Sequence, residues 1–231
     1  MDVRPWGIIR IARFWRLEAI RTDIGSGFFG MALGVVILAA GRSSRMGQPK
    51  PLLPWGPTTI LGHLVNQWKS VGAAQITIVY EPGTALVAEM DRLHFSSNHR
   101  IKNPDAGRGM FSSIRCAAEW PGWETQLTLW AIVLGDQPHL KLEMLRKLVE
   151  FGEVHPGQAS QPEFAGRPGH PVIMPKEMFY QVPGAHANDL KEFLRTRSRA
   201  LFHCEDPGIG LDLDYPEDYE RAKQQYFGLH S

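Results

Sequence analysis

Short apolar segments alternate with amphipathic segments from residue 31 onward, and this alternation constrains the fold more than any other feature of the chain. Segments 35–39 and 127–134 are almost wholly apolar, which is typical of strands buried on both faces of a parallel sheet. The predicted strands are 35–39, 76–80, 100–102, 127–134, 159–164, 171–174 and 200–204. The predicted helices are 58–71, 84–93, 110–120, 140–151, 188–196 and 216–226.

The order of these segments predicts one three-layer α/β domain. Strand–helix–strand units form right-handed crossovers, so we expect a mostly parallel sheet with helices on both faces, an αβα arrangement. The C-terminal third is less regular. Segment 58–71 has two local features of a helix. Thr58 or Thr59 can cap its start, and apolar residues recur on one face.

The composition excludes several classes of protein. Lys and Arg together number 25, and Asp and Glu together number 24, so the formal net charge is +1. Nothing in this balance favours a nucleic-acid or membrane-surface partner. The two cysteines, Cys116 and Cys204, are too few for a disulfide framework or a cysteine-rich metal site. We therefore expect a globular protein of the reducing cytoplasm.

Residues 1–30 differ from the rest of the chain because arginines repeatedly interrupt their apolar residues. No stretch reaches the roughly 18 apolar residues that a membrane-spanning helix needs, so we expect no transmembrane segment. The uninterrupted apolar core of a signal peptide is missing as well. We expect a disordered or loosely docked extension, with a short amphipathic helix as the alternative. The folded domain would then occupy residues 31–231, and Met31 is an alternative start.

A loop rich in glycine, serine and proline follows the first predicted strand and spans residues 40–57. The backbone N–H groups of such a loop can bind an anion at the carboxyl edge of a parallel sheet. The patterns G-x-G-x-x-G and G-x-x-x-x-G-K-[ST] do not fit the glycine spacing. The loop instead carries cations and hydroxyl groups that suit a polyphosphate, with a solvated basic loop as the alternative. These residues are Arg42, Ser43, Ser44, Arg45 and Lys50.

This loop resembles the start of the MobA-like nucleotidyltransferases, which have a glycosyltransferase-A-like (GT-A-like) fold, that of the nucleotide-diphospho-sugar transferases. It looks most like the molybdenum cofactor cytidylyltransferases and their guanylyl relatives. The matching residues are Ala39-Ala40-Gly41, Ser44-Arg45-Met46-Gly47, Lys50 and Leu52-Leu53. The resemblance implies that Ala39, Ala40 and Gly41 contact the nucleobase through their backbone. The Ala40-Gly41 pair looks like the cytidylyl branch, because guanylyl members usually have two glycines there.

The same resemblance assigns the cations of the loop. Arg45 would hold the β- and γ-phosphates that leave as pyrophosphate, and Lys50 would meet the α-phosphate under attack. Arg42 and Ser44 belong to the predicted nucleotide-binding residues as well.

Asp136 follows predicted strand 127–134, at the edge where ligands bind in open α/β folds. From position alone, a turn aspartate before Pro138 is the alternative. The sequence Leu134-Gly135-Asp136-Gln137-Pro138 resembles the magnesium-binding motif of the family. Mg²⁺ prefers one or two carboxylates together with phosphate oxygens, so a second carboxylate is expected elsewhere.

Residues 211–219 resemble the family sequence D-I-D-T-P-E-D-Y. The alternation of an extended segment places Asp212 and Asp214 on one side. Glu217 and Asp218 have a structural explanation, since they suit the start of the last predicted helix. We expect Asp212 to be the second magnesium ligand, with Asp214 as its substitute.

Residues 103–114 resemble the family loop N-x-x-W-x-x-G-M-x-x-S-L, which helps to select the base and positions the ribose. The matching residues are Asn103, Gly109, Met110 and Ser113. Ala106 stands where tryptophan is usual. From the residues alone, Ser112 and Ser113 could equally be helix N-caps.

Residues 166–171 resemble the family loop R-x-G-H-P, which faces the second substrate. The resemblance implies that Arg167 and His170 hold a pterin or its phosphate, whereas the residues alone allow an ordinary loop histidine. Segment 187–194 departs from the family pattern G-D-x-G-A-R. This departure bears on which acceptor is bound more than on which nucleotide is bound.

Taken together, the resemblance implies Mg²⁺-dependent transfer of CMP from CTP to the phosphate of molybdopterin, with release of pyrophosphate. The acceptor phosphate is already ionised, so catalysis needs positioning and charge neutralisation rather than a strong general base. Guanylyl transfer, or transfer to a sugar or alkyl phosphate, is the alternative within this fold. A different class is a non-catalytic carrier that delivers the pterin to a client molybdoenzyme.

Overall fold

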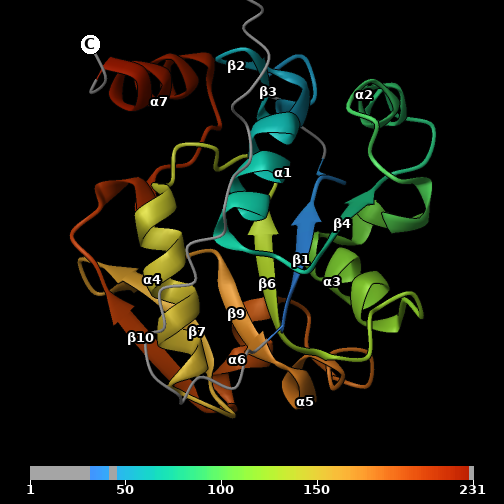
Figure 1. Ribbon diagram of the computed structural model, residues 1–231, viewed down its shortest axis with the longest axis vertical. Helices are drawn as coiled ribbons and strands as arrows, with labels where there is room; N and C mark the ends of the chain where they lie inside the picture. Colours follow the sequence, from blue (N-terminus) through green and yellow to red (C-terminus); the bar gives the residue numbers. More distant parts are fainter. Residues whose placement is uncertain (1–31, 42–45, 229–231) are drawn as a thin grey trace, which may run out of the picture.

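The computed structural model describes residues 32–41 and 46–228, so the expectations for residues 1–30 and for Arg42, Ser44 and Arg45 lie outside the described residues. Its centre is an eight-stranded sheet of order β10-β7-β9-β6-β1-β4-β5, with β8 paired to β7 (Figure 1). The strands are β1 (Ala32–Leu38), β4 (Gln75–Tyr80), β5 (Arg100–Lys102), β6 (Leu127–Leu134), β7 (Ala159–Phe164), β8 (Arg167–Pro168), β9 (Val172–Pro175) and β10 (Arg199–His203).

Most strands of the sheet run in the same direction. β1 is parallel to β4 and β6, β4 is parallel to β5, and β7 is parallel to β10. β9 is antiparallel to both β6 and β7, so β7 and β10 run in the direction of β6. The predicted mostly parallel sheet is confirmed. The carboxyl ends of β1, β4, β5, β6, β7 and β10 meet at one edge of the sheet, called the carboxyl edge below.

Helices cover both faces of the sheet and complete the three predicted layers (Figure 1). In β1, Val35 and Ile37 pack into one hydrophobic cluster and Val36 and Leu38 into the other, because successive side chains of a strand point to opposite faces. The first cluster includes residues of α1 (Ile60–Val71), α2 (Leu86–Arg92), α4 (Leu142–Glu153) and α7 (Pro216–Gly228). The second includes residues of α3 (Met110–Glu119), α5 (Lys176–Phe179) and α6 (Leu190–Arg195).

Helix α1 begins two residues later than the sequence predicts. Its first two predicted residues form β3 (Thr58–Thr59), which pairs with β2 (Pro54–Trp55) in an antiparallel hairpin. Thr59 then caps α1, because its Oγ1 accepts a hydrogen bond from the N–H of Gly62 at 3.1 Å. The hairpin and α5 were not predicted, since segments of two to four residues are too short to show a period.

Helix α7 and the β2–β3 hairpin lie together beyond the carboxyl edge (Figure 1). Trp55 of the hairpin packs against the rings of Tyr219, Tyr226 and Phe227 of α7. The Tyr219 hydroxyl also donates a hydrogen bond to the carbonyl oxygen of Pro54. These contacts fix the C-terminal segment over the edge at which ligands bind in open α/β folds.

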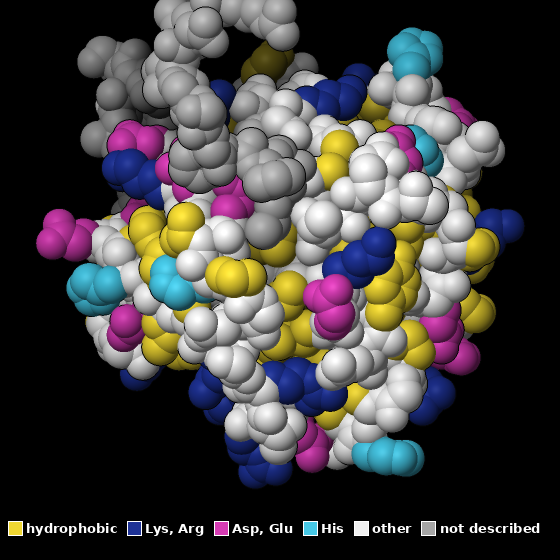
Figure 2. All heavy atoms as spheres, turned by 60° about the horizontal axis from the view of Figure 1, so that its bottom comes forward, with side chains coloured by type: hydrophobic (Ala, Val, Ile, Leu, Met, Phe, Trp, Pro, Cys, Tyr) yellow, Lys and Arg dark blue, Asp and Glu magenta, His cyan; other side chains and the backbone are white. Residues whose placement is uncertain are grey.

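Within the described part of the chain, no helix has both the length and the apolar character needed to cross a membrane. Figure 2 shows one face of the molecule, on which positive and negative side chains are interspersed. This mixture agrees with the formal net charge of +1.

Candidate active site

A pocket of about 450 Å³ opens at the carboxyl edge, between the ends of β1 and β6 and the start of α3. Its walls combine the first loop, the loop before α3 and the residues that follow β6. Eight predicted site residues line it: Ala39, Ala40, Gly41, Lys50, Gly109, Met110, Ser113 and Asp136. The structure therefore brings together three motifs that are far apart in the sequence.

Gly135 places Asp136 in this pocket. Its N–H donates a hydrogen bond to the carbonyl oxygen of Leu38 at 3.0 Å, so the end of β6 lies directly against the end of β1. A Cβ atom at position 135 would stand only 2.6 Å from that same oxygen. The absence of a side chain therefore lets the two strand ends approach, and Asp136 follows directly in the pocket that Ala39 also lines.

Asn103 holds the loop before α3 but does not line the pocket. It is fully buried, and its Nδ2 donates hydrogen bonds of 2.9 Å to the Oγ atoms of both Ser112 and Ser113. Its Oδ1 accepts a hydrogen bond from the N–H of Asp105 at 3.0 Å. The residue before the first turn of α3 is Gly109, so the alternative that Ser112 or Ser113 is the N-cap is wrong.

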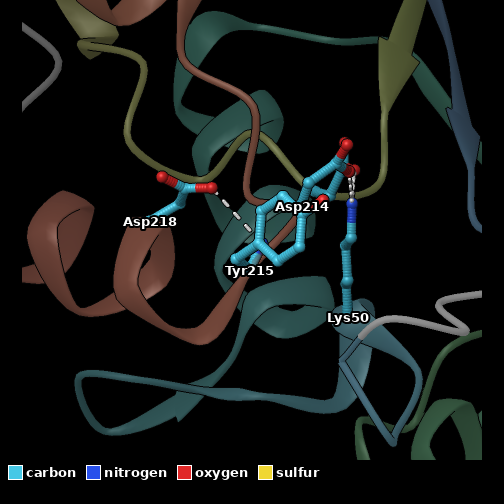
Figure 3. A network of polar contacts seen from close by, with 5 residues as sticks. Lys50, Asp214, Tyr215 and Asp218 are labelled. Carbon is cyan, nitrogen blue, oxygen red and sulfur yellow. Dashed lines mark hydrogen bonds and ion pairs between the residues drawn. The ribbon is translucent and has the colours of Figure 1, made fainter.

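Lys50 lies between two carboxylates. Its Nζ is 3.0 Å from Oδ2 of Asp136 and 2.7 Å from Oδ1 of Asp214, and its side chain is only 12% exposed. Figure 3 shows Lys50 and Asp214 pointing toward one another. The 3₁₀ turn η1 (Lys50–Leu52) supplies the lysine, and the segment between the 3₁₀ turn η4 (Pro207–Gly210) and α7 supplies Asp214. Burial alone would lower the pKa of Lys50, but hydrogen bonds and charges from Asp214 and Asp136 outweigh it and raise that pKa.

Asp212 adds a third carboxylate near this ion pair. Burial is the main cause that raises its pKa, and the negative charges of Asp136 and Asp214 raise it further. Lys50 and His139 offset part of this effect. The site therefore concentrates more negative than positive charge among these residues, and a cation would stabilise it.

The predicted acceptor residues lie at the same edge but outside the pocket lining. Arg167 belongs to β8 and is exposed. His170 is partly buried, and burial lowers its pKa against the opposing effects of a backbone hydrogen bond with Ile132 and the charge of Asp136. Gly169 packs so closely on Ile209 that a Cβ atom there would lie 2.5 Å from Ile209 Cγ2. The loop thus rests on η4, which leads to Asp212 and Asp214.

His139 was not among the predicted site residues. Its Nε2 donates a hydrogen bond to the carbonyl oxygen of Gly208 at 2.9 Å, and the side chain is 8% exposed. Burial lowers its pKa, while the Gly208 contact and the charges of Asp136, Asp206 and Asp212 act in the opposite direction. His139 therefore ties the loop of Asp136 to η4. The sequence signal is a histidine three residues after the predicted metal ligand, but its partner is 69 residues away.

Comparison with known proteins agrees with this architecture. Residues 35–201 match the family described as "MobA-like NTP transferase domain". The chain is 30% identical over 197 residues to the molybdenum cofactor cytidylyltransferase of Escherichia coli K12, a match that covers 84% of this chain and 97% of that protein. It is 32% identical over 117 residues to the molybdenum cofactor guanylyltransferase of Xanthomonas euvesicatoria, covering 49% of this chain and 52% of the relative.

Solved structures share the fold. Rv0371c from Mycobacterium tuberculosis superposes with a TM-score of 0.67 at 24% identity, covering 84% of this chain and 99% of that chain. Molybdopterin-guanine dinucleotide biosynthesis protein A from Archaeoglobus fulgidus gives a TM-score of 0.63 at 16% identity, covering 83% and 97%. The fold is an α/β fold with a pocket at the carboxyl edge of its sheet. The chain belongs to the MobA-like NTP transferase family, and it is a nucleotidyltransferase.

Proposed function

We propose that the protein transfers CMP from CTP to the phosphate of molybdopterin and releases pyrophosphate. The observation that carries this proposal is the pocket in which Lys50 and Asp136 meet the Ala39–Gly41 backbone. The E. coli relative named for this activity matches over 97% of its own length. The Ala40-Gly41 pair also supports the cytidylyl branch.

The described residues divide the work of binding the nucleotide. Ala39, Ala40 and Gly41 would present backbone groups to the base, and the loop held by Asn103 lines the same pocket. Lys50 neutralises the α-phosphate as a point charge. Arg45, together with Arg42 and Ser44, would hold the β- and γ-phosphates, as the sequence motif implies.

We propose a divalent cation, Mg²⁺, as the cofactor, held by Asp136 and Asp214 with Asp212 beside them. The donor chemistry fits, because the Lys50 ammonium already bridges oxygens of Asp136 and Asp214. This bridging favours Asp214 over Asp212 as the partner of Asp136. When bound, the ion supplies charge neutralisation to the phosphates.

Two further observations bear on the metal. No group of three or more His, Cys, Asp or Glu side chains is arranged as a metal site within the described residues. Two carboxylates completed by phosphate oxygens suit Mg²⁺ better than such a cage. A second structure of Rv0371c is a complex with manganese, at a TM-score of 0.63 and 23% identity.

The acceptor would enter from the side of η4 and the loop of residues 165–170. His170 and Arg167 are the residues proposed to hold the pterin or its phosphate. The acceptor phosphate needs no deprotonation, so these residues serve orientation rather than proton transfer. A molybdoenzyme that receives the product is the proposed partner, and the cytoplasm is the proposed location.

Guanylyl transfer is the second candidate, because guanylyltransferases also match parts of the chain. Pyrophosphate release should be measured with each of the four nucleoside triphosphates and molybdopterin. Release with CTP alone supports the proposal, whereas release with GTP assigns the guanylyl branch. Copurification with a molybdoenzyme but no turnover would favour the carrier, although a carrier has no use for Lys50 and Asp136 in this arrangement.

A further inference from the structure

We propose that Lys50 has a second role before the nucleotide arrives: its ammonium group stands in for a divalent cation between Asp136 and Asp214 and keeps free metal ions from binding there. The inference rests on the proposed function, since it assumes that these carboxylates hold the metal during turnover. It makes Lys50 a positioning residue for the metal site as well as a phosphate-binding residue.

The first observation is that one nitrogen contacts two carboxylates. Lys50 Nζ lies within 3.0 Å of Asp136 Oδ2 and 2.7 Å of Asp214 Oδ1. Both oxygens therefore lie close enough to share a single cation. They come from positions 86 and 164 residues away from Lys50 in the sequence, so this is a tertiary arrangement and not a local turn.

The second observation is the charge that surrounds this nitrogen. Asp212 adds a third carboxylate two residues before Asp214 in the same segment. Carboxylates that share a partly buried site repel one another unless a cation lies among them. The Lys50 ammonium, with its side chain only 12% exposed, relieves part of that repulsion and keeps Asp136 and Asp214 together.

A divalent cation and this ammonium group would compete for the same oxygens. Mg²⁺ binds carboxylate oxygens at about 2.1 Å, which leaves no room for an ammonium hydrogen-bonded to them from the same side. A free ion must therefore displace Lys50, and the displaced ammonium loses two charged hydrogen bonds. When a nucleotide is present, its phosphates give Lys50 a new partner, and the carboxylates become available.

Nucleotide and metal should consequently bind with positive coupling. Coupling between two ligands is reciprocal and typically amounts to about 5–150-fold in affinity. The enzyme would take up the metal together with the nucleotide, and free metal would occupy the site weakly.

The test measures Mn²⁺ binding to the full chain. The electron paramagnetic resonance signal reports the concentration of free Mn²⁺. In the absence of nucleotide, we expect Lys50→Met to bind Mn²⁺ about tenfold more tightly than the unsubstituted protein. This change lies within the typical coupling of about 5–150-fold in affinity. Lys50→Arg, which keeps a cation, should not show the gain. Lys147→Met is the matched control, because Lys147 is 58% exposed on α4 and pairs with Glu143, so it removes the same charge elsewhere.

Asp136→Asn shows whether the Mn²⁺ binds at this site, and thermal melting by circular dichroism shows whether each variant is folded. Equal Mn²⁺ affinity in Lys50→Met, Lys147→Met and the unsubstituted protein, lowered by Asp136→Asn, would overturn the role of Lys50 and leave the metal site standing. Binding that Asp136→Asn does not weaken would instead refute the metal site of the proposed function.

If Lys50→Met does not fold, Lys50→Gln removes the same charge and takes its place in the comparison, and the unsubstituted protein provides a second measurement that can refute the inference. A non-hydrolysable CTP analogue should tighten its Mn²⁺ binding by about tenfold or more. Equal Mn²⁺ affinity with and without the analogue would overturn the inference.

Discussion

Replacing Gly135 by alanine tests whether the close contact between β1 and β6 places Asp136. The new Cβ would lie 2.6 Å from the carbonyl oxygen of Leu38, a separation that real Cβ contacts essentially never show. The neighbour is the backbone of β1, which is paired on both sides by β6 and β4, so it cannot rotate away as a flexible side chain can. The strand ends must separate by several tenths of an ångström.

The expected losses of stability and of turnover follow from that contact. Overpacking of this kind destabilises a protein by about 1–3 kcal/mol. At about 2–4 °C per kcal/mol for a chain of this size, the melting temperature should fall by about 4–8 °C for a loss near 2 kcal/mol. Turnover should fall at least tenfold, because misplacing a catalytic group by about 1 Å can reduce the rate about 100-fold.

The assay pairs thermal denaturation with pyrophosphate release at saturating substrates. Gly184→Ala is the control, since a Cβ atom at that glycine meets no atom within 4 Å. It should leave both measurements nearly unchanged. A Gly135→Ala protein with the melting temperature and turnover of the control would refute the link between this contact and the position of Asp136.

Three other substitutions probe the supports of the site and of the fold. Asn103→Ala removes a buried side chain that donates hydrogen bonds to Ser112 and Ser113. We expect the free energy of unfolding in urea to fall by about 1–3 kcal/mol and the KM for the nucleotide to rise. An unchanged KM would contradict the role of Asn103 in holding the loop. Tyr219→Phe removes the hydrogen bond to Pro54 and should lower stability by about 1 kcal/mol, and an unchanged unfolding midpoint would count against it. The hydrogen bond from Arg92 is the main cause that lowers the pKa of Glu89. Ionised Glu89 therefore stabilises the fold above its unfolded-state pKa, and this stabilisation is lost as the pH falls through its folded-state pKa. Glu89→Gln should therefore destabilise the protein at neutral pH and have little effect in acid, and a pH-independent difference in unfolding free energy would exclude this explanation.

Much of the fold follows from local signals in the sequence. The strands 100–102, 127–134 and 159–164 have the predicted bounds, and the clearest signal is the almost wholly apolar run of residues 127–134. The direction of β9 was not predicted. A strand of four residues carries no signal for whether it pairs parallel or antiparallel, and its neighbours β6 and β7 determine that.

Eight of the residues that line the pocket were also predicted from the sequence. Its glycine-rich loop and Asp136 stand beside buried strands, where side-chain chemistry is easily recognised in a sequence. The pairing of Lys50 with Asp214 was not predicted, because alternation along an extended segment cannot distinguish Asp212 from Asp214. Asn103 was assigned to the nucleotide, yet its burial and its two serine partners make it a support of the loop.

Nucleotide-dependent stabilisation is the most direct test of whether the pocket beside Asp136 binds CTP. Thermal denaturation should be measured with ATP, CTP, GTP and UTP, with and without Mg²⁺, beside Asp136→Ala. A ligand at about 100 times its dissociation constant adds about 2.7 kcal/mol to stability, which corresponds to a rise of several degrees at this size. We expect a Mg²⁺-dependent rise in melting temperature with CTP, and we expect Asp136→Ala to abolish it. A rise with GTP alone would contradict the cytidylyl assignment, and no rise with any nucleotide at millimolar concentration would contradict the proposed nucleotide site.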